Sequence, residues 1–461
     1  MAMTRMDSQP NQRLSFAELL ASRPIGFHQL ILVALLLLVL VIDGIDIQLL
    51  SLVAPVILDE WSVDKADFGP ALAGALIGMS AGSLIGGALG DRFGRRRVLI
   101  LSVVGFGIAT VLAGTTQGVA GMAVLRIISG IGFGAAAPNA VALANEWLPE
   151  GVRARATSLL SIGTPAGGMI GASLALSVLP VWGWRGSFYA CGILTLAVTI
   201  GIILLVRESP AFLAATGNAR QAQKNAQQIM GNIGTAQLRF DNVGDTPGGG
   251  RGGFLSRAYL RLNLGAGLAF FVIAYVSYAL VAWTAIMLTS LGFSMAQALV
   301  AVFAFNLAAV GAAVATGFVL GTLGSRATLA GSSTLLLLVI GLLAWQLNAS
   351  AQSGTALAVQ ILTGCAGGFA GAAMATIYSM MAAGYDVACR SAGLGFGMTL
   401  GRAGGILASL VGGYLLELRQ SDPIPFLAAL ALAATMGIGC AFLSDRHIPQ
   451  QAKSIAPAAG Q

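Results

Sequence analysis

In the stretch Val41-Ile42-Asp43-Gly44-Ile45-Asp46-Ile47-Gln48-Leu49-Leu50, two carboxylates lie inside the first long apolar segment of the chain. The segment is long enough to span a bilayer, which takes about 20 residues in a helix. An Asp near the centre of such a helix costs about 2.5 to 3.5 kcal/mol, so it usually faces a water-filled cavity or a partner and marks an ion or proton path. Asp43 and Asp46 share one helix face. We predict that this pair carries protons; the alternative is that one acid only pairs with a basic residue to hold helices together.

The composition is that of an integral membrane protein. Hydrophobic residues make up 56% of the 461 residues and charged residues only 9%, whereas a soluble domain carries about 25% charged residues. The net charge of +7 does not indicate a nucleic-acid partner, because the basic residues cluster in short loops between apolar runs. Four cysteines without paired spacing and two histidines at opposite ends of the chain predict no disulfide framework and no metal site. We expect no cofactor, with the proton as the coupling ion.

Twelve apolar segments are each long enough to cross a bilayer. They are expected at residues 29–57, 67–90, 97–117, 120–146, 156–180, 186–206, 261–289, 295–320, 327–347, 353–384, 391–417 and 424–444. The outer loops then hold only Lys65, Arg185 and Arg419, which places both termini in the cytoplasm. The polar residues before the first segment lack a cleavage site, so we predict a cytoplasmic tail and not a signal peptide.

The chain is predicted to consist of two six-helix halves. Its one long polar interruption contains the glycine-rich run of residues 245–253, which is typical of a flexible linker. The glycines of segment five recur in segment eleven, as Gly163, Gly167 and Gly171 and then as Gly397, Gly401 and Gly405. Such a parallel duplication is found in transporters whose substrate site lies between two rocking halves.

The predicted fold class is therefore an all-α integral membrane protein with twelve transmembrane helices in two pseudo-symmetric six-helix bundles around a central cavity. The expected domains are a cytoplasmic N-terminal tail at 1–28, a bundle at 29–206, a cytoplasmic linker at 207–257, a second bundle at 258–444 and a cytoplasmic C-terminal tail at 445–461.

A glycine-rich turn follows the second segment, in the run Gly86-Gly87-Ala88-Leu89-Gly90-Asp91-Arg92-Phe93-Gly94-Arg95-Arg96-Arg97. One acid and several arginines beside a helix end can form ion pairs that break and re-form as two halves rock. The run resembles the signature of the major facilitator superfamily between its second and third helices. We predict a cytoplasmic gate made of Gly90, Asp91, Arg92, Gly94 and Arg95. The corresponding run of the second half, residues 321–326, lacks the acid, so the gate is expected to be asymmetric.

Arg126 opens the fourth segment, ahead of Gly130, Gly132 and Gly134. The pattern resembles the second signature of the superfamily, in which the arginine is associated with proton coupling. Because an arginine does not lose its proton in a protein, its role would be to tune the proton affinity of a neighbouring carboxylate, either Asp43 or Asp46. The alternative is an arginine whose head group extends to the outer membrane interface.

Further motifs resemble the aromatic acid/proton symporters, a branch of that superfamily found in bacterial inner membranes. They include Asp43-Gly44-Ile45-Asp46, Pro138-Asn139-Ala140 followed by Glu146, and Leu400-Gly401-Arg402-Ala403-Gly404. The resemblance implies that Glu146 belongs with the proton-coupling residues and Asn139 with the substrate-binding residues. Ile45 replaces the aromatic residue of the family's motif, and Met374 occupies a position that is often polar, which leaves the identity of the substrate open.

Aromatic residues of the second half complete the predicted substrate site. The repeat places Tyr275 and Tyr278 opposite Asp43 and Asp46, and Trp283 and Tyr378 add further amphipathic rings. Such rings can stack on an aromatic substrate while they hydrogen-bond its carboxylate. The alternative is that they belong to interfacial aromatic belts.

Arg402 is expected in the middle of the eleventh segment, where a guanidinium needs an anion. The anion is either the substrate carboxylate or, as a permanent salt bridge, Asp43 or Asp46. We therefore predict a proton-coupled symporter, not an enzyme, that imports a small aromatic carboxylate such as a benzoate, hydroxybenzoate or phenylpropanoate by alternating access. It is expected to work as a monomer in the bacterial inner membrane. The alternatives are a proton-coupled multidrug, organic-acid or sugar transporter of the same superfamily, a membrane-embedded enzyme, and a sensor without flux.

Overall fold

The structure, a computed structural model, describes residues 16–230, 255–349, 356–386, 389–419, 422–444 and 448. In these residues, ten helices are long and apolar enough to cross a bilayer. Two of them are each a pair of helices joined at a kink: α7 (Gly163–Leu205) bends at Gly183 and α11 (Met295–Ala349) at Gly324. Counting both arms of these two helices gives twelve spans, so the predicted all-α membrane fold is confirmed.

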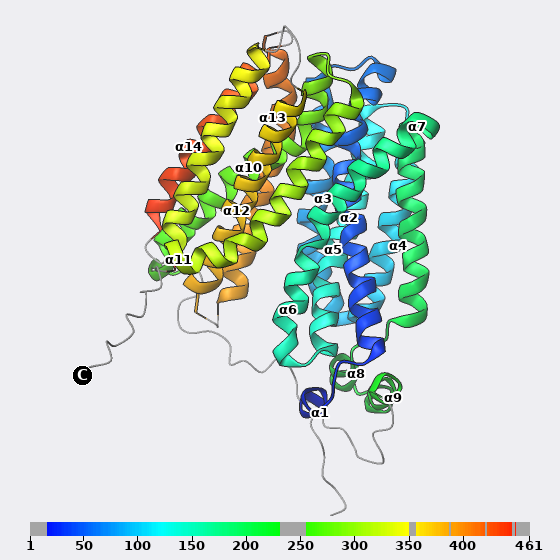
Figure 1. Ribbon diagram of the computed structural model, residues 1–461. Coiled ribbons are helices and arrows are strands. Elements are labelled where there is room, and N and C mark those ends of the chain that lie inside the picture. Colours follow the sequence, from blue (N-terminus) through cyan, green and yellow to red (C-terminus); the bar gives the residue numbers. More distant parts are fainter. Residues whose placement is uncertain are drawn as a thin grey trace, which may run out of the picture.

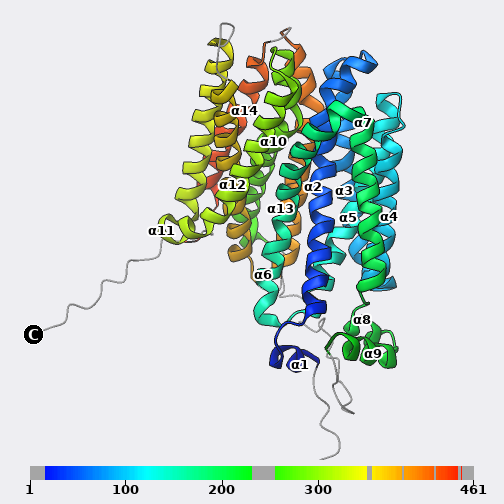
Figure 2. The same cartoon turned by 45° about the vertical axis from the view of Figure 1, so that its right-hand side comes forward.

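The spans form two bundles that lie side by side (Figures 1 and 2). The first contains α2 (Phe27–Trp61), α3 (Lys65–Phe93), α4 (Arg95–Ala113), α5 (Val119–Trp147) and both arms of α7, which the short α6 (Glu150–Ser161) precedes. The second contains α10 (Leu260–Ser290), both arms of α11, α12 (Ala356–Gly384), α13 (Arg390–Glu417) and α14 (Ile424–Leu443).

Four short helices lie outside the spans. They are α1 (Phe16–Ser22), α8 (Pro210–Ala215), α9 (Ala219–Met230) and the 3₁₀ helix η1 (Arg257–Tyr259). In Figure 1, α1, α8 and α9 lie together at the bottom of the first bundle, and we call this the linker end of the molecule. The predicted linker thus begins with two helices, because Ser209 caps α8 by accepting from the Phe212 amide at 3.2 Å and Asn225 of α9 donates to the Glu208 carbonyl at 3.1 Å. The glycine-rich run at 245–253 lies outside the described residues.

The two bundles meet most closely at the end opposite the linker end. There the amide of Ala66 at the start of α3 donates to the Glu417 carboxylate at the end of α13, at 3.0 Å. A Cβ on Gly413 would lie 2.2 Å from the Lys65 carbonyl oxygen, so α3 and α13 touch backbone to backbone. Toward the linker end, the ribbons of the two bundles diverge in Figure 1.

Glycines set the packing distance inside the first bundle, directly beside the two central aspartates. A Cβ on Gly44 of α2 would lie 1.9 Å from the Thr164 carbonyl oxygen of α7, and a Cβ on Gly167 would lie 2.0 Å from the Val41 carbonyl oxygen. Small residues at such crossings let helix backbones approach closely in membranes. Asp43 is therefore held against α7.

We predict that Gly44→Ala destabilises the protein by about 1 to 3 kcal/mol, because the added methyl overpacks the crossing of α2 and α7. Gly105→Ala in α4 is the matched control, since a Cβ at Gly105 would meet nothing within 4 Å. Thermal unfolding of both variants in detergent checks this expectation. Equal melting temperatures for the two variants would show that the crossing accommodates the added methyl group without loss of stability.

Candidate functional site

A buried ion pair joins α2 and α5 at the centre of the first bundle. Arg126 Nη1 lies 2.6 Å from Asp46 Oδ2, and Arg126 Nη2 donates to the Asp46 carbonyl at 2.8 Å. Thr110 of α4 donates to the other carboxylate oxygen, Oδ1, at 3.0 Å. The side chains of Arg126 and Asp46 are only 1% and 4% exposed, so Arg126 does not extend to the membrane interface. A fully enclosed pair with these extra hydrogen bonds has the geometry that a buried salt bridge needs.

Asp43 lies one turn away on α2 and forms no ion pair among the described residues. Asp43 is 1% exposed, and its Oδ2 accepts a long hydrogen bond of 3.5 Å from Thr164 Oγ1. A buried carboxylate without a partner is costly as long as it stays ionised. Asp43 is therefore the buried central acid that has no cationic partner at salt-bridge distance among the described residues.

Arg402 of α13 is the cation that faces the first bundle from the second. Its Nη1 donates to Ser83 Oγ of α3, and among the described residues it forms no ion pair. Arg402 is close enough for its charge to act on Asp43, but the predicted permanent salt bridge to Asp43 or Asp46 is not formed. A half-buried guanidinium without a carboxylate is a site ready for an anion.

Two tyrosines lie near this guanidinium. Tyr278 of α10 and Tyr378 of α12 are close enough to interact electrostatically with Arg402 and with one another. The ring of Tyr378 stands edge-on to Phe270, with centroids 4.9 Å apart and an interplanar angle of 80°. Aromatic rings in this position can pack against the ring of a substrate whose carboxylate binds Arg402.

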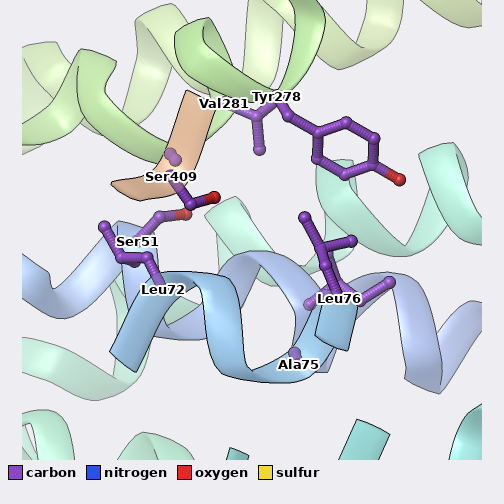
Figure 3. A pocket seen from close by; sticks show the side chains of 9 residues that line it. Ser51, Leu72, Ala75, Leu76, Tyr278, Val281 and Ser409 are labelled. Carbon is purple, nitrogen blue, oxygen red and sulfur yellow. The ribbon is translucent and has the colours of Figure 1, made fainter. Parts of the chain in front are cut away.

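A cavity lies beside Tyr278 where four helices of both bundles meet (Figure 3). Its lining comes from α2, α3, α10 and α13, and consists of Ile47, Ser51, Leu72, Ala75, Leu76, Tyr278, Val281, Ala282 and Ser409. Most of these side chains are apolar. The cavity is thus a small, mainly apolar space at the bundle interface.

Three further residues that the sequence predicts to bind substrate are buried. Trp283 is 0% exposed, and its Nε1 donates to the Ala408 carbonyl at 3.1 Å. Asn139 is buried between α3 and α5, where Nδ2 donates to the carbonyls of Gly86 and Ala135, both at 2.8 Å. Tyr275 is buried in α10. The structure brings Tyr278, Tyr378 and Arg402 together, and the substrate role of Trp283, Asn139 and Tyr275 stays a prediction.

The predicted gate residues cluster at the linker end. Asp91 Oδ1 forms an ion pair with Arg95 Nη2 at 2.9 Å, and Arg95 Nε lies 3.1 Å from Glu146 Oε1. Arg92 lies over the ring of Phe93, 5.4 Å from its centroid. Glu146 therefore belongs to the gate cluster and not to the central acids: it is twenty residues beyond Arg126 on α5, about 30 Å along the helix.

Glu208 anchors the same loop from the start of the linker. Its Oε1 accepts from the Arg96 amide at 3.1 Å, and its Oε2 would lie 2.4 Å from a Cβ on Gly94, whose φ of +102° favours glycine. Arg96 donates to the carbonyls of Val206 and Ile203 at the end of α7, at 2.6 and 2.7 Å. In the second bundle, Arg326 donates to the Ser444 carbonyl beyond α14 at 2.7 Å. In both bundles, an arginine of the loop thus donates to backbone carbonyls at the end of the last helix. The described residues of the second loop have no acids like Asp91, Glu146 and Glu208 of the first.

Gly90 completes the predicted gate set by allowing close packing. A Cβ at Gly90 would lie 1.8 Å from Asn139 Oδ1, so a larger residue there would have to displace the Asn139 side chain, which two hydrogen bonds hold in place. This contact links the gate loop to the fixed position of Asn139.

One polar contact between the bundles was not predicted. Gln48 of α2 and Asn306 of α11 exchange two side-chain hydrogen bonds, each 2.9 Å, and both residues are buried. The pair packs over Gly168, where a Cβ would lie 2.1 Å from Gln48 Nε2. An amide in the middle of an apolar span is the sequence signal that identifies such residues.

Two pseudo-symmetric six-helix bundles with charged groups buried at and beside their interface define a secondary membrane transporter. Residues 36–364 match the family model described as Major Facilitator Superfamily, and the chain belongs to that superfamily. It is thus a multi-pass membrane transporter and not an enzyme.

Several characterised proteins are similar over nearly the whole chain. The 4-hydroxybenzoate transporter PcaK of Pseudomonas aeruginosa is 27% identical, with 94% of this chain and 96% of the relative covered. The gallate transporter of Pseudomonas putida is 28% identical, with 90% and 92% covered. The 3-(3-hydroxy-phenyl)propionate transporter of Escherichia coli is 28% identical, with 84% and 87% covered.

Solved structures with the same fold include a D-xylose-proton symporter, which has a TM-score of 0.66 at 18% identity and covers 92% of this chain and 98% of its own. A bacterial homologue of the human lysosomal transporter Spinster has a TM-score of 0.67 at 18% identity, with 90% and 96% covered.

We predict that Arg126→Met and Asp46→Leu each destabilise the protein strongly, by about 3 to 5 kcal/mol, because either change leaves one buried charge without its partner. The double variant should recover most of this loss, since it replaces the pair with apolar side chains. Melting temperatures of the four proteins in detergent measure the coupling. A double variant whose loss equals the sum of the single losses would show that the two charges do not depend on each other.

Proposed function

We propose that the protein is a proton-coupled symporter that imports a small aromatic carboxylate. The observation that carries this proposal is the guanidinium of Arg402, which has no carboxylate partner in the described part of the chain and lies near Asp43, Tyr278 and Tyr378 at the bundle interface. The relatives support it, because their names specify aromatic carboxylates as the transported molecules. The site lies within one chain, which favours a working monomer.

The orientation follows from the distribution of basic residues. Lys and Arg are rare in the loops at the end opposite the linker end, so we place the linker end and both termini in the cytoplasm. In this orientation, the contact between α3 and α13 at Ala66 and Glu417 lies on the outer side.

Charge neutrality explains how proton and substrate would be coupled. In the empty protein, Asp43 and Arg402 carry opposite charges and can neutralise each other. When a carboxylate binds Arg402, Asp43 loses this compensation, and a bound proton removes its charge. With only one of the two bound, the closed site would enclose an uncompensated charge, which is costly in a low-dielectric interior. Proton and substrate are therefore expected to cross together.

The alternative is a transporter of the same superfamily for drugs, sugars or other organic acids. An unpaired cation in the site disfavours lipophilic cations, and a neutral sugar would leave the guanidinium without an anion. The aromatic rings near Arg402 favour aromatic over aliphatic acids.

We predict that Arg402→Lys weakens binding of 4-hydroxybenzoate at least about tenfold, equivalent to ~1.4 kcal/mol. Lysine keeps the charge but loses the planar pair of donors that fits a carboxylate. Binding to purified protein without a proton gradient is the measurement. The control is Arg419→Lys, at a side chain that is 71% exposed. Unchanged affinity in both Arg402→Lys and Arg402→Ala would exclude Arg402 as the anion site.

We predict that Asp43→Asn abolishes accumulation of substrate driven by a pH gradient in proteoliposomes but leaves exchange of labelled for unlabelled substrate. Asparagine resembles protonated Asp43 in shape and charge, so the loaded protein should still change conformation while no proton can be released. Gradient-driven accumulation by this variant at the parental rate would remove Asp43 from the coupling mechanism.

A further inference from the structure

The start of α3 and the end of α13 touch at the end of the molecule opposite the linker end. A Cβ on Gly413 of α13 would lie 2.2 Å from the Lys65 carbonyl oxygen, and a Cβ on Gly69 of α3 would lie 3.0 Å from the Ser409 carbonyl oxygen. The two helices belong to different bundles. This contact therefore has to open whenever the bundles separate at this end.

Two charged residues lie in this contact, and each is placed unfavourably for its own helix. Lys65 is the first residue of α3, and Glu417 is the last residue of α13. A helix carries partial positive charge at its N-terminus and partial negative charge at its C-terminus, so a cation is disfavoured at the start of α3 and an anion at the end of α13. Each charge is instead favourable for the opposite helix. Lys65 is also close enough for the charge of Glu417 to act on it.

Glu417 supplies a cap that α3 does not supply itself. The first amides of a helix have no partner within it, and the side chain of the residue before the helix usually accepts from one of them. Asp64 has this position at α3, but its side chain accepts no such hydrogen bond. The Ala66 amide donates instead to Glu417 Oε1 at 3.0 Å. The cap of α3 thus comes from the other bundle.

We propose that Lys65, Glu417 and the Ala66 amide form a latch between the bundles, which stabilises the state in which α3 and α13 touch. Separation at this end removes the cap from α3 and leaves each charge at the unfavourable end of its own helix. The latch is thus a conformational device of the transport cycle. It goes beyond the proposed function, because it acts whichever substrate is carried.

Chemical labelling of a thiol inside the contact measures how often the latch opens. Ser409 is 2% exposed and lies against Gly69, so in Ser409→Cys a hydrophilic maleimide is expected to reach the new thiol when α3 and α13 separate. Cys191 of the first bundle and Cys440 of the second are 0% and 2% exposed, and their labelling rates report general unfolding of each bundle. The purified full-length protein is labelled and digested, and the three rates are measured by mass spectrometry.

Glu417→Gln on the Ser409→Cys background should raise the labelling rate at position 409 at least about threefold relative to the two reference thiols. Glutamine keeps the size and an acceptor oxygen but loses the charge that strengthens the cap. Asp67→Asn is the matched control, because Asp67 is an exposed acid in the first turn of α3 that stays with its own helix when the bundles separate. The rate in this control should stay within about twofold of the parental rate.

The double variant Lys65→Glu/Glu417→Lys distinguishes the latch from a simple ion pair. It keeps two opposite charges but places each at the favourable end of its own helix, and lysine cannot accept from the Ala66 amide. We expect the double variant to raise the labelling rate at least as much as Glu417→Gln. A return to the parental rate would show a simple ion pair and overturn the crossed arrangement of charges. A parental rate in Glu417→Gln, or an equal rise in Asp67→Asn, would exclude the latch. Labelling needs no substrate, so each of these results leaves the proposed function to be decided by the binding and transport measurements.

Discussion

A charged side chain in the middle of a bilayer needs a partner, and the centre of this protein is arranged around that requirement. Asp46 and Arg126 satisfy it permanently, with a direct ion pair and a further hydrogen bond from Thr110. Asp43 and Arg402 have no such fixed partners among the described residues. The difference between these two sets separates groups that hold the first bundle together from groups that are available for a proton and an anion.

Close helix crossings position the available groups. Gly44 and Gly167 let α2 and α7 touch through their backbones, and neither glycine position has room for a side chain. This contact places Asp43 beside Thr164. At the linker end, Gly94 and Glu208 hold the loop between α3 and α4 against the end of α7. Each bundle is thus tied internally at the centre and at its end, so the bundles are suited to move against each other as units.

The sequence predicted the fold well because twelve long apolar segments and a repeated glycine pattern leave few alternatives. It also identified Asp43, Asp46, Arg126 and Arg402, since charges in apolar spans are rare. It did not determine which acid pairs with Arg126, because the two lie on one helix face. The structure pairs Arg126 with Asp46, which also accepts a hydrogen bond from Thr110 of α4. Glu146 and Asn139 were assigned from a motif, which does not reveal the face of α5 that each occupies. Gln48 and Asn306 were not predicted as a pair, because an amide in an apolar span signals a polar contact but does not show which residue it contacts. The domain boundaries stay a prediction.

The paired amides of Gln48 and Asn306 are neutral, unlike the other buried contacts at the centre. An elementary charge that crosses the membrane field changes in energy by about 2.3 kcal/mol per 100 mV, whereas a neutral amide does not. Parting this pair moves no charge through the field. The contact that joins α2 to α11 therefore has the same strength in an energised cell and in a depolarised one, and only the charged groups and their cargo respond to voltage.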